Sequence, residues 1–574
     1  MFRSDRFEGY SVASFRQDVL SGIVVGIIAL PLGMAFAIAS GVSPEYGIIT
    51  TVVAGILTSL LGGSRFQIGG PTGAFIPVLF AIVMQYGYEN LLIAGCLAGA
   101  MLVVMGLLKL GSLIQFIPRP VITGFTTGIA VIIFSGQLAN FLGLSDLPKH
   151  EDFLSNMREI ALHVTQINLY AVVIALSGLA AMLLTARYAR KLPPALTGIV
   201  IATAVSMLLF KGQSATIGSA FGVMSGSFPA PALPEFTWAR IVEMLRPALV
   251  IAMLGGIESL LSAVVADRMT GTKHNSNREL IGQGIANLVT PLFGGIPATG
   301  AIARTAANIR NGAVSPLSGM IHGLFVLLVL LLLAPYASHI PLAAMAPILM
   351  VVAWNMSERK EFVRTLRTKT GDSLVLVVTF LLTVFASLPT AVEVGLLLAA
   401  VIFIKRMSES MRMSRVLPDT EQRHGKVNTR RVELGHACPQ VRLLSVEGSL
   451  FFGASGGLAS AIAVRELDGA RIVLLRMGRM PYLDMTGESE LGELLEMICQ
   501  SGGQLLLSGL HRQPANLLAR TGLLGKVGED QIFAHTGEAI ARALELLDTD
   551  RCKGCTRFAF RECEALSRQD SSTA

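Results

Sequence analysis

Long apolar runs separated by short polar segments fill the chain from Val19 to Ile404, and a mixed polar sequence follows from Lys405 onward. Because a helix needs about 20 apolar residues to cross the hydrocarbon core of a bilayer, each run predicts one membrane span. The pattern predicts fourteen spans, at roughly 19–39, 47–62, 72–86, 91–108, 117–141, 168–186, 195–211, 245–264, 280–292, 300–312, 316–334, 340–356, 372–388 and 390–404. Several are too short to cross the bilayer alone, notably 72–86, 280–292 and 300–312.

The basic residues between the spans indicate how the chain is oriented. Lysines and arginines cluster within residues 3–16, 187–191, 268–278, 359–369 and 405–415. With fourteen spans, all five clusters fall on the same side of the membrane as the two termini. Since positively charged loops face the cytoplasm, we expect both termini to be cytoplasmic.

The composition of the 574 residues agrees with a membrane protein of many spans. Apolar residues make up 52% and charged residues 15%, against about 25% charged in ordinary globular proteins. Mean hydropathy is +0.61. These values exclude a cytosolic enzyme, a disordered protein and a secreted disulfide scaffold. The net charge of +7 lies in loops between spans, which favours a role in topology and gives no indication of a nucleic-acid partner.

The change in composition near residue 405 predicts a division into domains. We expect a cytoplasmic N-terminus at 1–18, a membrane domain at 19–406, a linker at 407–434, a soluble domain at 435–548 and a tail at 549–574. Alternating strand-like and helix-like patterns predict that the soluble domain is a small α/β fold.

A short motif occurs twice in the membrane domain. Thr72-Gly73-Ala74 and Thr299-Gly300-Ala301 lie 227 residues apart, and each follows a Gly/Pro break and opens a short apolar helix. The first lies in the third predicted span and the second in the tenth. An odd offset of seven spans inverts the second copy, which predicts an inverted-repeat transporter with two broken helices near the membrane midplane. Chance recurrence in a Gly/Ala-rich chain is the alternative.

The broken helices suggest an anion site. The first N–H groups of a helix have no partner within it and carry partial positive charge, so two facing helix starts form a site for an anion. We expect Thr72, Gly73, Ala74, Thr299, Gly300 and Ala301 to bind substrate. Arg304 would complete the site, because an intramembrane arginine is costly and by default functional. The alternatives are plain helix kinks and an arginine that reaches toward the interface.

Glu258 lies in the middle of the apolar span 245–264. Burial disfavours the charged form of a carboxylate, so Glu258 is a candidate for carrying a coupling proton or pairing with a cation. A structural ion pair with Arg304 is the alternative. The two roles are compatible, since a pair that breaks on protonation can itself couple two events.

These motifs resemble the SulP (sulfate permease) family of anion transporters. The resemblance rests on Pro31-Leu-Gly-Met-Ala-Phe-Ala, Gly70-Pro-Thr-Gly-Ala, Gly124-Phe-Thr-Thr-Gly and, most specifically, Asp267-Arg-Met-Thr-Gly-Thr-Lys-His-Asn with Glu279-Leu-Ile-Gly-Gln-Gly-Ile-Ala-Asn. It implies an α-helical membrane protein with a seven-plus-seven inverted repeat, in which a core domain carrying the anion moves like an elevator against a gate domain. It also implies a homodimer in the inner (plasma) membrane.

The soluble part is similar to a STAS domain. The similarity rests on Val441-Arg-Leu-Leu-Ser-Val-Glu-Gly, Arg471-Ile-Val-Leu-Leu-Arg-Met, Pro481-Tyr-Leu-Asp-Met-Thr-Gly and Gly503-Gln-Leu-Leu-Leu-Ser-Gly. In soluble STAS relatives the residue that matches Thr486 is a phosphorylatable serine, which implies a regulatory site. A turn and helix start after a strand is the favoured interpretation of Thr486.

The resemblance offers evidence on which ion is coupled to anion transport but leaves the proton and sodium both open. In sodium-coupled bicarbonate members, an aspartate matches Glu258 and hydroxyl residues match Ser262 and Ile302. This chain keeps Ser262 but has an apolar Ile302, so we favour proton-coupled uptake of sulfate, bicarbonate or a C4-dicarboxylate. A sodium-coupled bicarbonate symporter and a passive anion channel or exchanger are the alternatives. We see no catalytic constellation, so we expect a transporter without enzymatic activity or cofactor.

The tail contains Cys552-Lys-Gly-Cys555 and Cys563. This spacing suggests zinc or an iron–sulfur cluster, but a fourth ligand is not evident and His535 is distant in sequence. We therefore expect reduced thiols without a metal.

Overall fold

The computed structural model describes residues 10–112, 118–144, 147–148, 150, 152–189, 192–386, 388–409, 412–415, 417–418, 427–428, 438–452, 470–557, 559–560 and 563–568. The chain divides into two compact units, residues 1–399 and 400–574. Each unit is described separately below.

Helices make up almost all of the first unit, and each predicted span coincides with one main helix. These helices are α1 (Val12–Ala39), α2 (Pro44–Leu61), α3 (Ile76–Tyr86), α4 (Tyr88–Leu107), α5 (Arg119–Gly136), α8 (Leu169–Tyr188), α9 (Pro194–Leu209), α11 (Trp238–Thr270), α12 (Ser276–Val289), α13 (Ile302–Arg310), α14 (Leu317–Ala337), α15 (Leu342–Met356), α17 (Gly371–Phe385) and α18 (Leu388–Glu409). Among the described helices, eight are long and apolar enough to cross a membrane. Four shorter helices connect them: α6 (Leu138–Leu142), α7 (Phe153–Leu162), α10 (Ile217–Phe221) and α16 (Arg359–Arg367).

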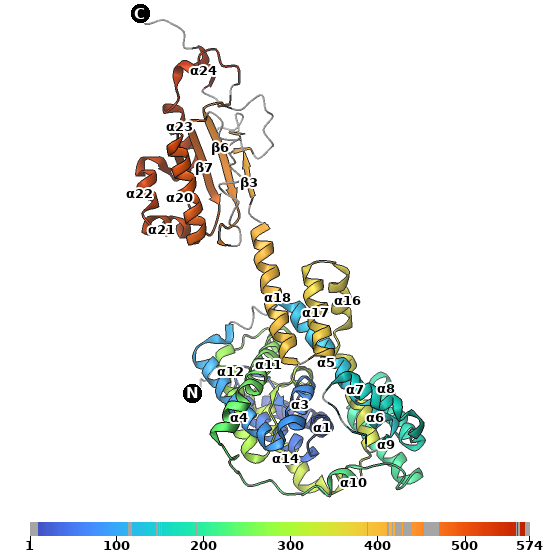
Figure 1. Cartoon of the computed structure of the whole chain (residues 1–574). Coiled ribbons are helices and arrows are strands. Elements are labelled where there is room, and N and C mark those ends of the chain that lie inside the picture. Colours follow the sequence, from blue (N-terminus) through green and yellow to red (C-terminus); the bar gives the residue numbers. More distant parts are fainter. Residues whose placement is uncertain are drawn as a thin grey trace, which may run out of the picture. The chain divides into compact units, whose positions relative to one another are not determined.

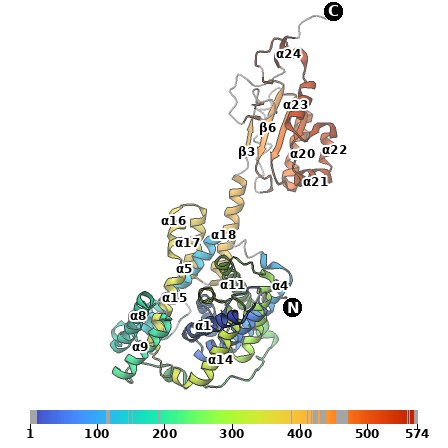
Figure 2. The ribbon, with the colours of Figure 1, turned by 180° about the vertical axis from the view of Figure 1, so that it is seen from behind.

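The helices form two bundles that lie beside each other (Figures 1 and 2) and are in contact, for example where α1 packs on α9 and α15. The core bundle contains α1–α4 and α11–α14, and the gate bundle contains α5–α9 and α15–α18. The contacts repeat between the halves: α4 packs on α11 and α12, as α14 packs on α1 and α2, and α5 packs on α17 as α15 packs on α8. Each pair is related to its counterpart by an offset of seven main helices. The structure therefore confirms the predicted seven-plus-seven inverted repeat.

Two short strands join the halves of the core. Strand β1 (Gly69–Gly70) pairs antiparallel with β2 (Thr299–Gly300), with Gly69 opposite Gly300 and Gly70 opposite Thr299. Backbone that is not helical must find partners when it lies at membrane depth, and this ribbon supplies them for both breaks. A 3-10 turn, η2 (Gly73–Phe75), leads from β1 into α3, and α13 follows β2.

The two copies of the sequence motif occupy different positions around this ribbon. Thr72 lies two residues after β1 and directly precedes η2. Thr299 is instead the first residue of β2, and Ala301 directly precedes α13. The two Thr-Gly-Ala motifs therefore locate the two helix breaks correctly, but equivalent residues of the two motifs do not occupy equivalent positions in the structure.

The second unit contains a five-stranded sheet with the order β3-β6-β7-β8-β9. The strands are β3 (Arg412–Arg415), β6 (Val441–Glu447), β7 (Ile472–Arg479), β8 (Gln504–Ser508) and β9 (Ile532–Phe533). All neighbours are parallel except β3, which is antiparallel to β6. Strand β3 lies within the segment expected to be a linker. It was missed because an edge strand pairs through its backbone, and Arg-Met-Ser-Arg has no distinct apolar pattern.

Helices supply the apolar cover for this sheet. Helices α20 (Met485–Gln500), α21 (Arg512–Arg520) and α22 (Leu523–Val527) contribute to one cluster of buried side chains with β6–β8. Helix α23 (Thr536–Glu545) and α24 (Cys563–Arg568) contribute to a second cluster, which includes Val441, Leu474 and Leu506. Alternate residues of the central strands therefore pack into two layers, as in the predicted small α/β domain. A separate two-residue pair joins β4 (Leu417–Pro418) and β5 (Val427–Asn428).

Candidate functional site

Thr72 and Glu258 come together in the core bundle. Thr72 precedes η2 and is buried, and Glu258 lies in the middle of α11 and is half-buried. The Thr72 hydroxyl donates a hydrogen bond to Oε2 of Glu258 at 2.9 Å. The acid predicted to take part in coupling therefore contacts a residue predicted to bind substrate.

Arg304 lies beside the β1–β2 ribbon, next to Gly70. Its side chain is only 2% exposed, and its Nη2 donates a hydrogen bond to the backbone carbonyl of Pro71. Within the part of the chain that the structure describes, its Nη1 has no hydrogen-bond partner. A buried cationic donor without a partner is costly, so this nitrogen is available for an anion.

Glycine at position 70 allows Arg304 to approach the ribbon. Its φ of +151° lies in a region that side-chain-bearing residues rarely adopt, and a Cβ there would lie 2.7 Å from Nη1 of Arg304. The guanidinium thus packs directly against the backbone of β1. Only glycine permits this contact without displacing the cation.

The two helix starts beside the ribbon leave donors available. No side chain of the described residues caps η2 after Thr72 or α13 after Ala301. The first N–H groups of both helices therefore retain their partial positive charge. Gly73 and Ala74 are buried at the start of η2. Their side chains are small and apolar, so the backbone N–H groups are the donors at this helix start.

The second copy of the motif uses most of its donors to hold the ribbon. The Thr299 hydroxyl shares a hydrogen bond with the Ser259 hydroxyl at 2.8 Å and donates to the carbonyl of Gly255. The N–H of Gly300 donates to Oγ of Ser259, and that of Ala301 donates to the carbonyl of Ile68. These three residues position β2 against α11 and β1. In this arrangement the Thr299 hydroxyl points to α11, and its expected role as a ligand stays a prediction.

Ser262 also contributes to packing. It lies one helical turn after Glu258, is fully buried, and donates to Oγ1 of Thr305 at 3.2 Å. Ile302, at the start of α13, is 38% exposed and offers no oxygen. The structure therefore brings Glu258 and Thr72 together but directs the Ser262 hydroxyl to α13.

Sequence reasoning missed three polar residues that support the site. Gln67 donates through Nε2 to the carbonyl of Ser259, and Ser259 contacts both Thr299 and Gly300. Thr305 accepts from the N–H of Ile68. Each is a buried polar residue in an apolar segment, within five residues of a break or of Glu258, and this signal could have identified them.

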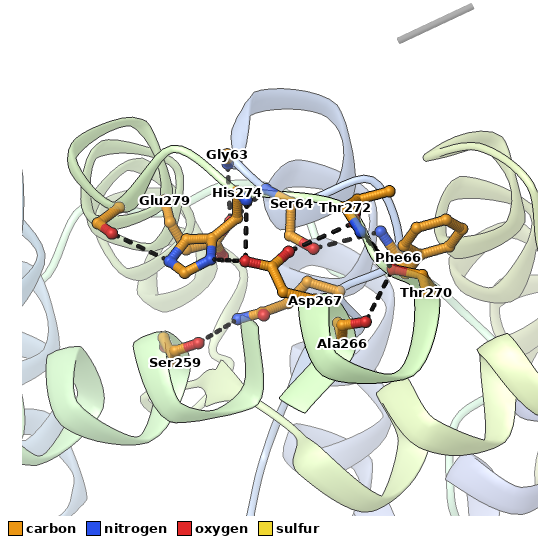
Figure 3. Close-up of polar contacts among 12 residues, drawn as sticks. Gly63, Ser64, Phe66, Ser259, Ala266, Asp267, Thr270, Thr272, His274 and Glu279 are labelled. Carbon is orange, nitrogen blue, oxygen red and sulfur yellow. Dashed lines mark hydrogen bonds and ion pairs between the residues drawn. The ribbon is translucent and has the colours of Figure 1, made fainter. Parts of the chain in front are cut away.

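The long signature motif forms a polar network at the end of α11 (Figure 3). Oδ2 of Asp267 lies within hydrogen-bond distance of Nδ1 of His274, at 2.7 Å, and also accepts from the backbone N–H of His274. Glu279 accepts from the N–H groups of Gly63 and Ser64 at 2.7 and 3.0 Å. Asp267 belongs to the last turn of α11. The motif therefore ties the α11–α12 connection to the segment that leads into β1.

A cavity of about 1170 Å³ separates parts of the core and gate bundles. Ile76 and Pro77 of α3 line it from the core, and Ile133 of α5 lines it from the gate. Its lining also includes residues of α6, α7 and α10. Thr72, Glu258 and Arg304 are not among its lining residues, so the candidate site is separated from this cavity.

In the second unit, Thr486 lies in the first turn of α20 and is half-buried. Asp484 caps this helix by accepting from the N–H of Gly487 at 2.9 Å. The position is thus a turn and helix start after a strand, as favoured from the sequence.

Comparisons with known proteins identify the class and then the family. The inverted repeat, the uncapped helix starts and the buried arginine define a membrane transporter for anions. The sequence model of the "Sulfate permease family" matches residues 15–379, and that of the "STAS domain" matches residues 437–539. The chain therefore belongs to the sulfate permease family, and it is an anion transporter with a C-terminal STAS domain. Its relatives are transporters rather than enzymes.

Two named relatives cover nearly the whole chain. A Bacillus subtilis protein named "Putative sulfate transporter YvdB" is 53% identical over 93% of this chain and 99% of its own length. The "Bicarbonate transporter BicA" of a Picosynechococcus species is 30% identical over 92% of this chain and 95% of its own length. The names of these relatives thus include two different anions.

Solved structures agree with the fold. The transmembrane domain of a cyanobacterial bicarbonate transporter BicA has a TM-score of 0.61 and 32% identity, and covers 68% of this chain and 98% of its own. The murine Slc26a9 anion transporter in the inward-facing state has a TM-score of 0.85 and 21% identity, and covers 94% of this chain and 93% of its own. At that identity, the second likeness shows the fold alone.

Proposed function

We propose that this chain takes up sulfate together with protons, as a secondary active transporter that works by an elevator mechanism. The proposal rests chiefly on the hydrogen bond between the Thr72 hydroxyl and the Glu258 carboxylate. This contact joins an ionisable group to the start of a broken helix. A proton on Glu258 can therefore change the donors that the helix start offers to an anion.

The coupling follows from electrostatics. Ionised Glu258 repels an anion beside Arg304. It also accepts the hydrogen bond of the Thr72 hydroxyl, so that this hydroxyl cannot donate to the anion. Protonation removes the negative charge and frees that hydroxyl to donate to the anion. Because linkage is reciprocal, bound anion raises the affinity of Glu258 for its proton by the same factor. Proton and anion are thus expected to bind and cross together.

Sulfate fits the donors better than a smaller monoanion. It is a dianion with four acceptor oxygens, and the site offers two uncapped helix starts and the free Nη1 of Arg304. The 53% identical relative is named as a sulfate transporter, which supports this choice. Bicarbonate and C4-dicarboxylates are the competing substrates.

A sodium-coupled bicarbonate symporter is the second candidate, because a 30% identical relative is named as a bicarbonate transporter. A small hard cation requires several oxygen ligands. Beside Glu258, the Ser262 hydroxyl is directed to Thr305 and Ile302 has no oxygen. These contacts favour the proton over sodium.

The interface between the two bundles suits a sliding motion. A Cβ on Gly73 would lie 2.8 Å from Sδ of Met356, so the start of the first broken helix packs closely on gate helix α15. Small residues let two helices approach closely, and we place the sliding contact of the elevator at this interface. The further parts of the proposal are a homodimer, an inner-membrane location and cytoplasmic termini.

Uptake into proteoliposomes tests the proposal. Labelled sulfate, bicarbonate and succinate are offered in turn under an inward proton gradient and then under an inward sodium gradient. We expect sulfate to accumulate with the proton gradient alone. Accumulation of bicarbonate with sodium would support the second candidate, and flux that responds to neither gradient would indicate a channel or exchanger.

A further inference from the structure

A second ionisable side chain is buried in the core bundle, apart from the contact between Thr72 and Glu258. His322 lies in the second turn of α14 and is fully buried. Within the described residues, neither of its ring nitrogens has a hydrogen-bond partner. Because buried polar atoms are nearly always paired, an unpaired imidazole in a membrane bundle requires an explanation.

His322 lies beside the same ribbon as the candidate anion site. A Cβ on Gly55 of α2 would lie 3.0 Å from Nδ1 of His322 and 3.6 Å from the backbone carbonyl oxygen of Gly69. The next residue of β1, Gly70, packs against Nη1 of Arg304. The imidazole and the guanidinium therefore approach neighbouring residues of one short strand. Glycine at position 55 leaves room for the ring, since a methyl group there would crowd it.

Arg304 is the charged side chain that connects the two buried ionisable groups. Its positive charge acts both on Glu258 and on His322. Helix α14 packs mainly on α1 and α2, and the carboxylates near these helices have partners of their own. Asp18 accepts from two backbone N–H groups just before α14, and Glu279 accepts from two just after α2. The charge that the imidazole experiences therefore depends on Arg304 and on what binds to it.

Charge balance gives the imidazole a role in transport. In the empty site, ionised Glu258 balances Arg304, and a neutral His322 adds no charge. Sulfate brings two negative charges, whereas the proton on Glu258 that frees the Thr72 hydroxyl cancels only one of them. The loaded core would therefore carry a net negative charge through the bilayer, which is costly. One further proton on the imidazole makes the loaded core as neutral as the empty one.

We propose that His322 is the second proton-binding group of the transporter, so that sulfate enters with one proton on Glu258 and another on His322. This inference rests on the proposed function, proton-coupled uptake of sulfate. Bound sulfate outweighs the positive charge of Arg304, and a nearby negative charge favours a protonated imidazole. The backbone carbonyl of Gly319, on the preceding turn of α14, lies near the ring and can accept from the added N–H. Both protons enter from the outer medium with sulfate and leave with it to the cytoplasm.

The same balance predicts that the two groups fail in different steps. In Glu258→Gln the empty core retains the unbalanced charge of Arg304, so its return across the membrane is opposed and repeated delivery of protons stops. In His322→Gln the empty core is balanced, but the core loaded with sulfate and one proton is negative. The histidine variant is therefore expected to bind sulfate with fewer protons and to transport it more slowly.

The unmodified chain in proteoliposomes tests the number of protons without any variant. The exterior is held more acidic than the interior by about one pH unit, which corresponds to about tenfold in sulfate accumulation for each coupled proton. We expect net sulfate entry to stop at about 100-fold accumulation. We also expect this ratio to stay the same when valinomycin and potassium set the membrane potential to either sign.

Two other results of this experiment have separate meanings. Accumulation of about tenfold that changes with the membrane potential would overturn the second proton, although proton-coupled uptake itself would stand. A pH gradient that does not concentrate sulfate at all would overturn both the proposed function and this inference.

Proton uptake on binding tests whether the second proton belongs to His322. Sulfate binding to the detergent-purified full chain is measured by calorimetry in buffers of different ionisation enthalpy, over a series of pH values. We expect a maximum of about two protons taken up per sulfate by the native chain and about one by His322→Gln. His322→Asn provides the same test with a shorter amide. His339→Gln, which changes an exposed histidine just after α14, should match the native chain. Equal proton uptake by the His322 variants and the native chain would overturn the proposal.

Discussion

The guanidinium of Arg304 contributes the only full positive charge among the residues assigned to the candidate site. One of its nitrogens donates to Pro71 and Nη1 is free within the described structure. Arginine can hold the backbone with one nitrogen and an anion with another, because its donors form a planar fork. A lysine has a single ammonium group and cannot reproduce this geometry.

We therefore expect Arg304→Lys to weaken sulfate binding. Hydrogen bonds to charged groups contribute about 1.5–3 kcal/mol, which corresponds to roughly 10- to 100-fold in affinity. Binding to the detergent-purified protein can be measured by calorimetry. Arg310→Lys is the matched control, because Arg310 is exposed and ends the same helix. Equal affinity in both variants would show that Arg304 does not contact the anion.

The sequence could identify Arg304 and Glu258 because a charged residue in an apolar run stands out. It could not establish that Thr299 would turn to α11, because that depends on the side on which β2 pairs. Thr72 and Thr299 share their neighbours in the sequence, yet one precedes a helix and the other lies in a strand. Tertiary pairing, rather than local sequence, decides that the Thr72 hydroxyl contacts Glu258 and the Thr299 hydroxyl contacts Ser259.

At the scale of elements, the β1–β2 ribbon depends on small residues. A methyl group on Gly300 would overlap the amide nitrogen of Gln67 and lie 3.1 Å from Cα of Ser259. We expect Gly300→Ala to lower the stability of the membrane unit by about 1–3 kcal/mol, the usual cost of overpacking. Thermal unfolding in detergent measures this. Gly136→Ala is the control, since nothing lies within 4 Å of a Cβ at that position of α5. Equal melting temperatures would contradict the close packing of the ribbon.

The signature motif allows a second prediction at this scale. Glu279 accepts two backbone N–H groups, from Gly63 and Ser64, with its carboxylate. Glu279→Gln removes the charge from these hydrogen bonds, so we expect a loss of about 1–3 kcal/mol in stability. Glu361→Gln in the exposed helix α16 is the comparison, because its ion pair with Arg364 is largely exposed. If Glu279→Gln were as stable as Glu361→Gln, the hydrogen bonds of Glu279 would not stabilise the membrane unit, which would contradict this account of the motif.

Hydropathy predicted the existence of every main helix, because the backbone N–H and C=O groups of an apolar segment within the bilayer need the hydrogen bonds that a helix supplies. It placed the ends less well: α1 begins at Val12 and α11 extends from Trp238 to Thr270, beyond the predicted 19–39 and 245–264. The polar ends of these helices carry no apolar signal. The edge strand β3 was missed for the same reason, as its pairing with β6 is made by backbone groups.

At the scale of the whole molecule, each unit has its own set of buried apolar side chains. A unit with its own core can fold alone. We expect a chain truncated after Glu409 to bind sulfate within about twofold of the full chain. Calorimetry with both proteins tests this, with Arg304→Lys in the truncated chain as the negative control. Loss of binding on truncation would indicate that the STAS domain contributes to the site.

The central claim is that anion and proton cross together through Glu258, and proton entry driven by sulfate tests it most directly. Proteoliposomes containing a pH-sensitive dye receive an inward sulfate gradient with no initial pH difference. We expect the interior to acidify with the native chain, to remain unchanged with Glu258→Gln, and to acidify with Glu393→Gln, which alters an exposed carboxylate of α18. Sulfate entry without acidification in the native chain, or equal acidification with Glu258→Gln, would contradict the account.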